Sequence, residues 1–275
     1  MFGIKTRMQS MLKKRHKVIA ITHPIFETQL LSGKTALITG GTGGIGFAIA
    51  KSLIESGCNV IICGTNSNKL ANLTEKIQNS DRVKTMRFDI ADTADVTTFV
   101  EKASTLFGSI DILINSAGVH TEKANFWTMT PDEYNRVMNI NLTGTFFLCQ
   151  AVARYMCQNE IHGRILLVSS SRGSEPAWSP YGISKWGLNG FTKGLAEILI
   201  SRGITVNAIA PGTTATALIG ANEKGNLFTD DNRKGRYATP DEIAVWAKML
   251  VSDASDMITG EVLHVSAGRG TIDIR

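Results

Sequence analysis

The stretch Thr39-Gly-Gly-Thr-Gly-Gly-Ile-Gly46 stands between a short apolar run, Lys34–Thr39, and the helical pattern of Ile45–Ser56. Gly40 can take the positive φ of a tight turn, and glycines without a Cβ let a ligand approach the backbone. The helix that follows would present free N–H groups and the positive end of its dipole to that ligand. The spacing is Gly-x-x-x-Gly-x-Gly and not Gly-x-Gly-x-x-Gly. A strand, this turn and a helix in succession predict an α/β fold with a site for the pyrophosphate of a dinucleotide.

Strand and helix patterns alternate along the chain after residue 33. Apolar runs predict strands at Lys34–Thr39, Asn59–Cys63, Val83–Phe88, Ile110–Asn115, Arg164–Ser169, Thr205–Ile209 and Val262–Val265. Helical patterns lie at Ile45–Ser56, at Ser67–Gln78 and near 93–107, 131–158, 181–201 and 240–251. This alternation predicts one doubly wound, Rossmann-type domain over residues 31–275, a parallel sheet with helices on both faces. An irregular segment, about 213–236, would lie at the carboxyl ends of the strands, where such folds bind ligands.

The positive net charge belongs to the N-terminus. Of the net +5, residues 1–24 contribute +6, because they hold six Lys and Arg residues and no Asp or Glu. No basic stripe recurs inside the domain, so we expect no nucleic-acid partner. No stretch reaches the roughly 18 apolar residues of a membrane span. Residues 1–30 are therefore expected to form a flexible basic extension, with an organelle transit peptide as the alternative.

The four cysteines give no sign of a metal site. Cys58, Cys63, Cys149 and Cys157 form no Cys-x-x-Cys pair and have no histidine at zinc-ligand spacing. Buried thiols in a reducing cytoplasm are the expectation.

A second motif, Tyr181-Gly-Ile-Ser-Lys185, begins directly after Ser179-Pro180. A serine N-cap and a proline in the first turn predict the start of a helix, which places the Tyr181 phenol and the Lys185 ammonium on one face. Free tyrosine has a pKa of about 10, which is too high for efficient proton exchange near neutral pH. A nearby ammonium would favour the phenolate and lower that pKa. Such a phenol could protonate an alkoxide as it forms.

Five ordered motifs resemble those of the short-chain dehydrogenase/reductase family. They are the glycine turn, Asn115-Ser-Ala-Gly118, Asn141 in Asn-Leu-Thr-Gly, Tyr181-x-x-x-Lys185 and Pro211-Gly212. The resemblance spans about residues 30–268. It implies an oxidoreductase in which hydride passes directly between a nicotinamide cofactor and a carbon atom, without a metal. Family members usually have Asn at the position of Ser116, which is a conservative departure.

The same resemblance implies a cofactor site at the carboxyl ends of the strands. Asp89 would contact the adenine amino group, Asn115 would support the central strand, and Thr216 would bind the nicotinamide carboxamide. Turn chemistry is the alternative role for the threonines after Pro211. The residues expected at the cofactor are Gly40, Thr42, Gly43, Gly44, Ile45, Gly46, Thr65, Asn66, Asp89, Ile90, Asn115, Ala117, Gly118, Tyr181, Lys185, Pro211, Gly212, Thr214 and Thr216.

The choice between NADP(H) and NAD(H) stays open, with a slight preference for NADP(H). An acid at the end of the second strand would bind a ribose 2′-hydroxyl, but Gly64 occupies that position. NADP-dependent relatives often carry Arg at the next position, where this chain has Thr65. Thr65, Asn66, Ser67 and Lys69 could still bind a 2′-phosphate.

Four residues are implied to be catalytic. Tyr181 would be the general acid in reduction and the general base in oxidation, and Lys185 would lower its pKa and bind the nicotinamide ribose. Asn141 would organise a water-linked proton relay. A serine would bind the substrate oxygen.

The serine is one of three in a row. Counting back from Gly173 selects Ser170, with Ser169 as the alternative. The separation of 11 between Ser170 and Tyr181 is about two residues shorter than in relatives, which indicates a shortened loop over Arg172–Ser179. The histidines His120, His162 and His264 have no evident partner and are expected to be structural or exposed.

The expected reaction interconverts a secondary alcohol and a ketone. Reduction of a 3-oxoacyl thioester on an acyl-carrier protein, oxidation of a sugar or polyol, and a steroid-like substrate are the alternatives within that class. A nucleotide sensor without catalysis is the alternative outside it. Glu175, Trp178 and the segment near 213–236, as a lid of the catalytic domain, are expected to select the substrate. A homotetramer or homodimer would form through the helices near 131–158 and 181–201.

Overall fold

The computed structural model describes residues 29–77, 80–216 and 225–272 of the 275-residue chain. The basic extension up to residue 28 and positions 217–224 of the expected lid lie outside the described residues. No helix among those described is long and apolar enough to cross a membrane.

A seven-stranded parallel sheet forms the centre of the molecule, in the order β3-β2-β1-β4-β5-β6-β7. Its strands are β1 (Thr35–Thr39), β2 (Asn59–Gly64), β3 (Val83–Arg87), β4 (Ile112–Asn115), β5 (Arg164–Val168), β6 (Thr205–Pro211) and β7 (Val262–Val265). Every neighbouring pair is parallel. The predicted Rossmann-type doubly wound fold is confirmed, and the predicted strand ends are right to within two residues.

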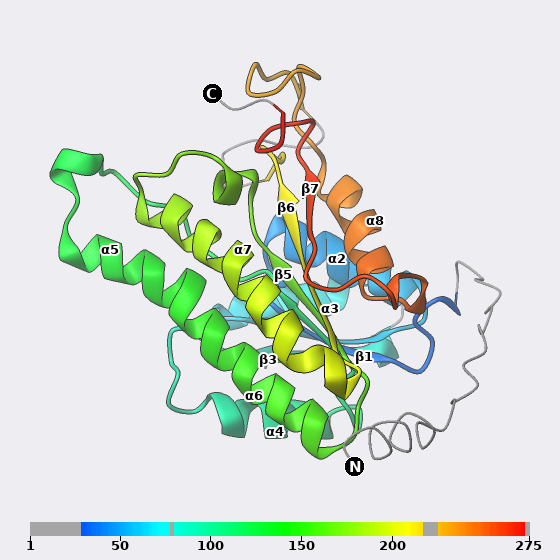
Figure 1. Cartoon of the computed structure of the whole chain (residues 1–275). Helices are drawn as coiled ribbons and strands as arrows, with labels where there is room; N and C mark the ends of the chain where they lie inside the picture. The colour runs from blue at the N-terminus through cyan, green and yellow to red at the C-terminus, as the bar shows by residue number, and fades with distance from the viewer. Residues whose placement is uncertain (1–28, 78–79, 217–224, 273–275) are drawn as a thin grey trace, which may run out of the picture.

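Helices cover both faces of the sheet (Figure 1). The main helices are α2 (Gly44–Glu55), α3 (Ser67–Lys76), α4 (Val96–Thr105), α5 (Pro131–Met138), α6 (Gly144–Gln158), α7 (Pro180–Leu199) and α8 (Pro240–Leu250). Apolar side chains of α4, α6 and α7 share one core with the sheet, and those of α2, α3 and α8 share the other. Strands such as β1 and β5 are buried throughout because both of their faces are covered.

The predicted helix over 131–158 is interrupted. Residues Asn139–Thr143 form a π-helical turn between α5 and α6, and Asn141 lies at its centre. The side chain of Asn141 is fully buried and bonds outside its own helix, which competes with regular α-helical packing. π-Turns of this kind are frequent at functional sites.

All seven strands point their carboxyl ends to one edge of the sheet. The strand order reverses between β1 and β4, and open α/β sheets bind ligands at such a switch point. The glycine turn after β1, the serines after β5 and the Pro211-Gly212 segment after β6 all meet at this edge. The topology therefore brings together motifs that lie up to about 170 residues apart.

Candidate active site

The glycine turn forms a cradle at the N-terminus of α2. Gly40 has a φ of +63°, and a Cβ there would lie 2.6 Å from the backbone nitrogen of Ala117. Gly43 is the N-cap of α2 and offers no side-chain acceptor, and the first turn has no acidic residue. The first N–H groups of α2 are thus left for an anion, as a pyrophosphate requires. The cradle fits a dinucleotide.

A cavity of about 270 Å³, here called the cofactor cavity, follows this cradle. It is lined by Gly40, Thr42, Gly43, Gly44, Ile45, Gly46, Ser116, Gly118, Val168, Ser169, Tyr181, Lys185 and Thr216. The glycine turn and the Tyr181–Lys185 motif, predicted separately from the sequence, are therefore walls of one cavity.

Several residues expected at the cofactor do not line this cavity. Asn115 is buried and hydrogen-bonds to Thr39 and to Thr145, so its side chain joins β1, β4 and α6. Ile90 is buried in the core, where its carbonyl oxygen leaves no room for a Cβ at Gly144. Asn115 therefore supports the central strand, as the resemblance implied, whereas Ile90, which was expected at the cofactor, packs in the core.

The expected adenosine end lies at the edge of β2 and β3. Thr65 and Asp89 are exposed directly beyond these strands. The Asn66 side chain accepts a hydrogen bond from the Lys69 nitrogen (3.0 Å) as the N-cap of α3. Arg87 was absent from the expected set. Its Nε donates to the carbonyl oxygen of Thr65 (3.2 Å), which places a cation at this edge.

The segment that begins at the end of β6 lines a second cavity next to the cofactor cavity. Pro211, Gly212, Thr214 and Thr216 line a larger cavity of about 460 Å³, and Thr216 also lines the cofactor cavity. The Thr214 hydroxyl donates to the Gly212 carbonyl (3.0 Å), which is the turn chemistry considered as its alternative role. The methyl of Thr216 would lie 2.8 Å from a Cβ at Gly44, so Thr216 closes over the glycine turn.

The larger cavity, here called the substrate cavity, contains Tyr181, Ser170 and Ser169 in its lining. Ser179 is the N-cap of α7 and Pro180 stands in its first turn, as the sequence predicts. The Ser170 hydroxyl acts on the Tyr181 phenol and lowers its pKa. Ser169 instead donates to Asn189 Oδ1 (2.6 Å). Of the two candidate serines, Ser170 is the one at the phenol.

Lys185 is buried behind Tyr181. Its Nζ lies 5.7 Å from the centroid of the Tyr181 ring and donates to the carbonyl oxygen of Val168 (2.9 Å). Burial lowers the pKa of Lys185 to about 8. The amino group can therefore lose or gain a proton near neutral pH.

The pKa of Tyr181 differs from the sequence-based expectation. Burial raises it above its ordinary value, although the Ser170 hydroxyl and the charges of Arg172 and Arg269 act in the opposite direction. The expectation that the nearby ammonium lowers the pKa of Tyr181 is wrong in direction for the protein without its cofactor.

Asn141 anchors α5 and α6 to the loop after β4. Its Oδ1 accepts from the Val119 nitrogen (2.8 Å), and its Nδ2 donates to the Val119 carbonyl (3.0 Å) and to Ser184 Oγ (3.1 Å). Ser184 in turn donates to the carbonyl of Tyr181 (2.7 Å). Asn141 thus connects the loop after β4 to the first turn of α7, where Tyr181 stands.

His120 was wrongly expected to be without a partner. Its ring stacks on the Tyr181 ring with centroids 4.1 Å apart, and it lines the substrate cavity. Burial lowers its pKa, and the charges of Lys185 and Arg172 lower it further. His120 follows the carboxyl end of β4, and ligands of open α/β sheets bind beyond the carboxyl ends of the strands. This position in the sequence could have indicated that His120 lies at the site. His264 likewise has a partner, the Ser174 hydroxyl (2.9 Å).

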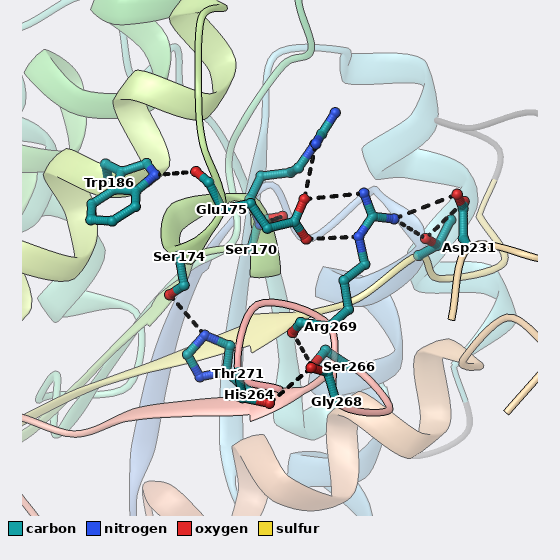
Figure 2. A network of polar contacts seen from close by, with 12 residues as sticks. Ser170, Ser174, Glu175, Trp186, Asp231, His264, Ser266, Gly268, Arg269 and Thr271 are labelled. Carbon is teal, nitrogen blue, oxygen red and sulfur yellow. Dashed lines mark hydrogen bonds and ion pairs between the residues drawn. The ribbon is translucent and has the colours of Figure 1, made fainter. Parts of the chain in front are cut away.

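Glu175 was expected to help select the substrate, and its side chain is held in an ionic network. It is only 3% exposed, and Arg269 Nε donates to its Oε1 (2.7 Å) while Arg172 Nη1 donates to its Oε2 (2.9 Å). Figure 2 shows Glu175 and Arg269 facing each other, with Asp231 beyond the guanidinium of Arg269. Arg269 lies after β7, far from the motifs in the sequence, and was missed.

Comparison with known proteins identifies the family. The model of the short chain dehydrogenase family matches residues 34–226. The chain belongs to the short-chain dehydrogenase/reductase family. It is 37% identical over 245 residues to the 3-oxoacyl-[acyl-carrier-protein] reductase of Aquifex aeolicus, covering 86% of this chain and 98% of that protein.

Two solved structures of this family agree in fold. One is the 3-ketoacyl-(acyl-carrier-protein) reductase of Brucella melitensis complexed with NADH (TM-score 0.80, 31% identity, 87% of this chain and 99% of that one). The other is a gluconate 5-dehydrogenase of Burkholderia cenocepacia in complex with NADP and tartrate (TM-score 0.79, 33% identity, 88% and 97%). The short-chain dehydrogenase/reductase described here is an NAD(P)(H)-dependent oxidoreductase that interconverts alcohols and ketones.

Substitution of Gly40 by alanine tests the cradle. A Cβ would collide with backbone atoms of Ser116 and Ala117 at 2.6 Å, at a φ that alanine disfavours. We expect Gly40→Ala to weaken cofactor binding at least about tenfold, since a displaced turn no longer fits a pyrophosphate. Fluorescence titration with NADPH and NADH measures it. Gly33→Ala is the control, because Gly33 has a φ of +78° but nothing within 4 Å of a Cβ. Equal binding by both variants would contradict the assignment.

Proposed function

We propose that Tyr181 is the general acid and base of this oxidoreductase. The observation that carries the proposal is that Tyr181 lines both the cofactor cavity and the substrate cavity, with Ser170 beside it in the lining of the substrate cavity. In the reductive direction the Tyr181 hydroxyl gives its proton to the carbonyl oxygen, and Ser170 stabilises that oxygen by a hydrogen bond. The nicotinamide supplies or accepts the hydride when it is bound.

Lys185 and Asn141 support this step from behind. Lys185, with a pKa of about 8, can exchange protons with groups near Tyr181 while its Nζ stays bonded to Val168. Asn141 holds the loop after β4 against the first turn of α7. We assign Lys185 to the proton relay and to the ribose, and Asn141 to the geometry of the relay. A positively charged nicotinamide would add to the charges that lower the pKa of Tyr181.

We further propose that NADP(H) is the preferred cofactor. Gly64 has no carboxylate to repel a 2′-phosphate, and the guanidinium of Arg87 bonds to the Thr65 carbonyl at the end of β2. A cation at this edge favours the phosphate over the free hydroxyl.

Two substitutions should move this preference in opposite directions. We expect Thr65→Arg to raise the ratio of kcat/KM for NADPH over NADH, and Arg87→Gln to lower it, each by roughly three- to tenfold because both positions are exposed. Steady-state kinetics with each cofactor measures the ratios. Arg82→Gln, an exposed arginine just before β3, serves as control. An unchanged ratio in both variants would show that the 2′ group binds elsewhere.

The relatives do not select one substrate, since their names include acyl-carrier-protein thioesters and gluconate. A 3-oxoacyl thioester, a sugar-like hydroxy acid and a steroid therefore all stay candidates, since another relative is named a 3alpha-hydroxysteroid dehydrogenase. The experiment that tests the class is a screen of cofactor oxidation against ketones, 3-oxoacyl thioesters and keto-sugars. Tight cofactor binding without turnover of any of them would favour a nucleotide sensor instead.

We also propose a homotetramer or homodimer that works in the cytoplasm. Helices α6 and α7 expose the large apolar side chains of Phe146, Phe147, Trp186 and Ile198, which a second subunit would cover. All four cysteines are free thiols, consistent with a reducing compartment. Sedimentation velocity gives the oligomeric state directly.

A further inference from the structure

The substrate cavity has a charged wall. Arg172, Arg269 and Asp231 line it together with Tyr181 and Ser170. Arg172 follows Ser170 by two residues, and its backbone nitrogen donates to the Ser170 hydroxyl (3.2 Å). The cationic side chain of Arg172 and the hydroxyl of Ser170 therefore come from the same short turn.

Glu175 organises the two arginines without lining the cavity. Its carboxylate is almost fully buried and accepts hydrogen bonds from Arg269 Nε (2.7 Å), Arg269 Nη2 (3.3 Å) and Arg172 Nη1 (2.9 Å). Burial alone would raise the pKa of Glu175, but these guanidinium contacts hold it below its ordinary value. Glu175 is thus ionised, and one carboxylate is shared by two guanidinium groups.

Arg269 is held by a specialised turn after β7. Ala267, Gly268 and Gly270 have φ values of 54°, 88° and 78°, so the backbone around Arg269 is in the left-handed region. The Ser266 hydroxyl donates to the Arg269 carbonyl (2.6 Å), and Figure 2 shows this turn below the guanidinium. Arg269 Nη1 also donates to the Thr213 hydroxyl (3.1 Å). Arg269 is a fixed partner of Glu175, and only 12% of its side chain is exposed.

Arg172 differs from Arg269 in its accessibility. Its side chain is 51% exposed, and within the described residues the guanidinium bonds to Glu175 through Nη1 alone. A guanidinium has five N–H donors in a planar fork that matches a carboxylate or a phosphate. Donors of Arg172 are therefore left at the wall of the substrate cavity.

We propose that Arg172 binds an anionic group of the substrate, a carboxylate or a phosphate, and that Glu175 and Arg269 position its guanidinium. This inference rests on the proposed ketone reduction and names its substrate class. The phosphates of the cofactor have their own cradle at α2, and Arg172 is not among the described residues that line the cofactor cavity. The carboxylate of Asp231, whose Oδ1 lies 3.7 Å from Arg269 Nη1, would repel an anion bound in this cavity.

The test compares keto acids with their neutral esters. The full-length enzyme is assayed with 3-oxobutanoate, 4-oxopentanoate and 5-oxohexanoate and with their methyl esters, so that the spacing of ketone and charge varies. We expect the wild type to prefer at least one acid over its ester. Arg172→Gln should lower kcat/KM for that acid roughly ten- to hundredfold. It should lower kcat/KM for the ester much less, because the ester has no charge to lose and only the effect of Arg172 on the pKa of Tyr181 remains. The ester activity also shows that the variant is folded.

Two further variants sharpen this result. Arg154→Gln removes an exposed arginine on α6 and should change neither substrate. Asp231→Asn should raise kcat/KM for the acid by about two- to fivefold, because a half-exposed opposing charge is lost. Equal losses for acid and ester in Arg172→Gln, or no preference for any acid in the wild type, would overturn the proposal.

A binding measurement separates this inference from the proposed function. Calorimetry with tartrate and glycerol 3-phosphate, against dimethyl tartrate and glycerol, requires no turnover. If no oxo compound is reduced, the proposed function fails for these ketones. Anion binding to the wild type that is lost in Arg172→Gln would still support an anion site at Arg172. The anion that binds shows whether the group is a carboxylate or a phosphate. If the wild type binds neither anion, the inference is wrong.

Discussion

Tyr181→Phe is expected to lower kcat roughly 10²- to 10⁴-fold, the usual contribution of a positioned general acid. The substitution removes only the phenolic hydroxyl, whose pKa the Ser170 hydroxyl lowers. The phenyl ring keeps its place against His120, whose ring centroid lies 4.1 Å from that of Tyr181. Cofactor binding should therefore stay within about threefold of the wild type, because the glycine cradle of α2 is untouched.

Single-turnover kinetics and cofactor titration measure the two quantities separately. Tyr134→Phe, at an exposed position on α5, is the matched control and should be fully active. If Tyr181→Phe turns over within a few-fold of the wild type, another group donates the proton. A parallel loss of cofactor binding would mean that the phenol holds the cofactor and that its part in proton transfer is unproven.

Lys185→Met is expected to change stability in a pH-dependent way while it removes activity. The pKa of Lys185 falls from 10.5 to about 8 in the folded protein because the amino group is buried. Between these values the unfolded chain binds more protons than the folded one, so the free energy of unfolding of the wild type rises with pH. The cost of burying the ammonium is present in full below pH 8 and disappears as the pH approaches 10.5.

The methionine variant has no such cost. Its free energy of unfolding relative to the wild type should therefore be roughly 3 kcal/mol more favourable at pH 7 than at pH 10.5. The bond from Nζ to the Val168 carbonyl is lost at every pH and affects only the constant offset. Urea denaturation of the cofactor-free protein over this range measures the difference, with Lys193→Met on the exposed side of α7 as control. A pH-independent difference would contradict a buried amino group with a lowered pKa.

Much of the fold could be predicted because its signals are local. The apolar runs of β1 and β5 are buried throughout. The start of α7 depends only on its own first turn, where Ser179 is the N-cap and Pro180 follows it. The interruption at Asn139–Thr143 could not be predicted in this way. It depends on bonds from Asn141 to Val119 and Ser184, which are 22 and 43 residues away.

In the site, too, the local motifs could be predicted and the contacts between distant parts of the sequence could not. The glycine cradle and the Tyr181–Lys185 pair have fixed spacings, whereas Arg269 reaches the cavity only because β7 ends beside β6. Glu175 was predicted near the substrate from its loop, but its buried pairing with Arg269 spans 94 residues. The predicted direction of the shift in the pKa of Tyr181 was wrong for a similar reason, because the burial of a side chain depends on the packing of the whole domain.

We expect hydride to pass directly from the nicotinamide to a carbonyl carbon in the cavity beside Tyr181. The most direct measurement supplies cofactor deuterated at the transferring position, together with the best ketone of the keto acid and ester series, and locates the label by NMR. We expect one deuterium on the carbinol carbon of the product and hydrogen from solvent only on its oxygen. A product with solvent hydrogen on that carbon would contradict direct hydride transfer.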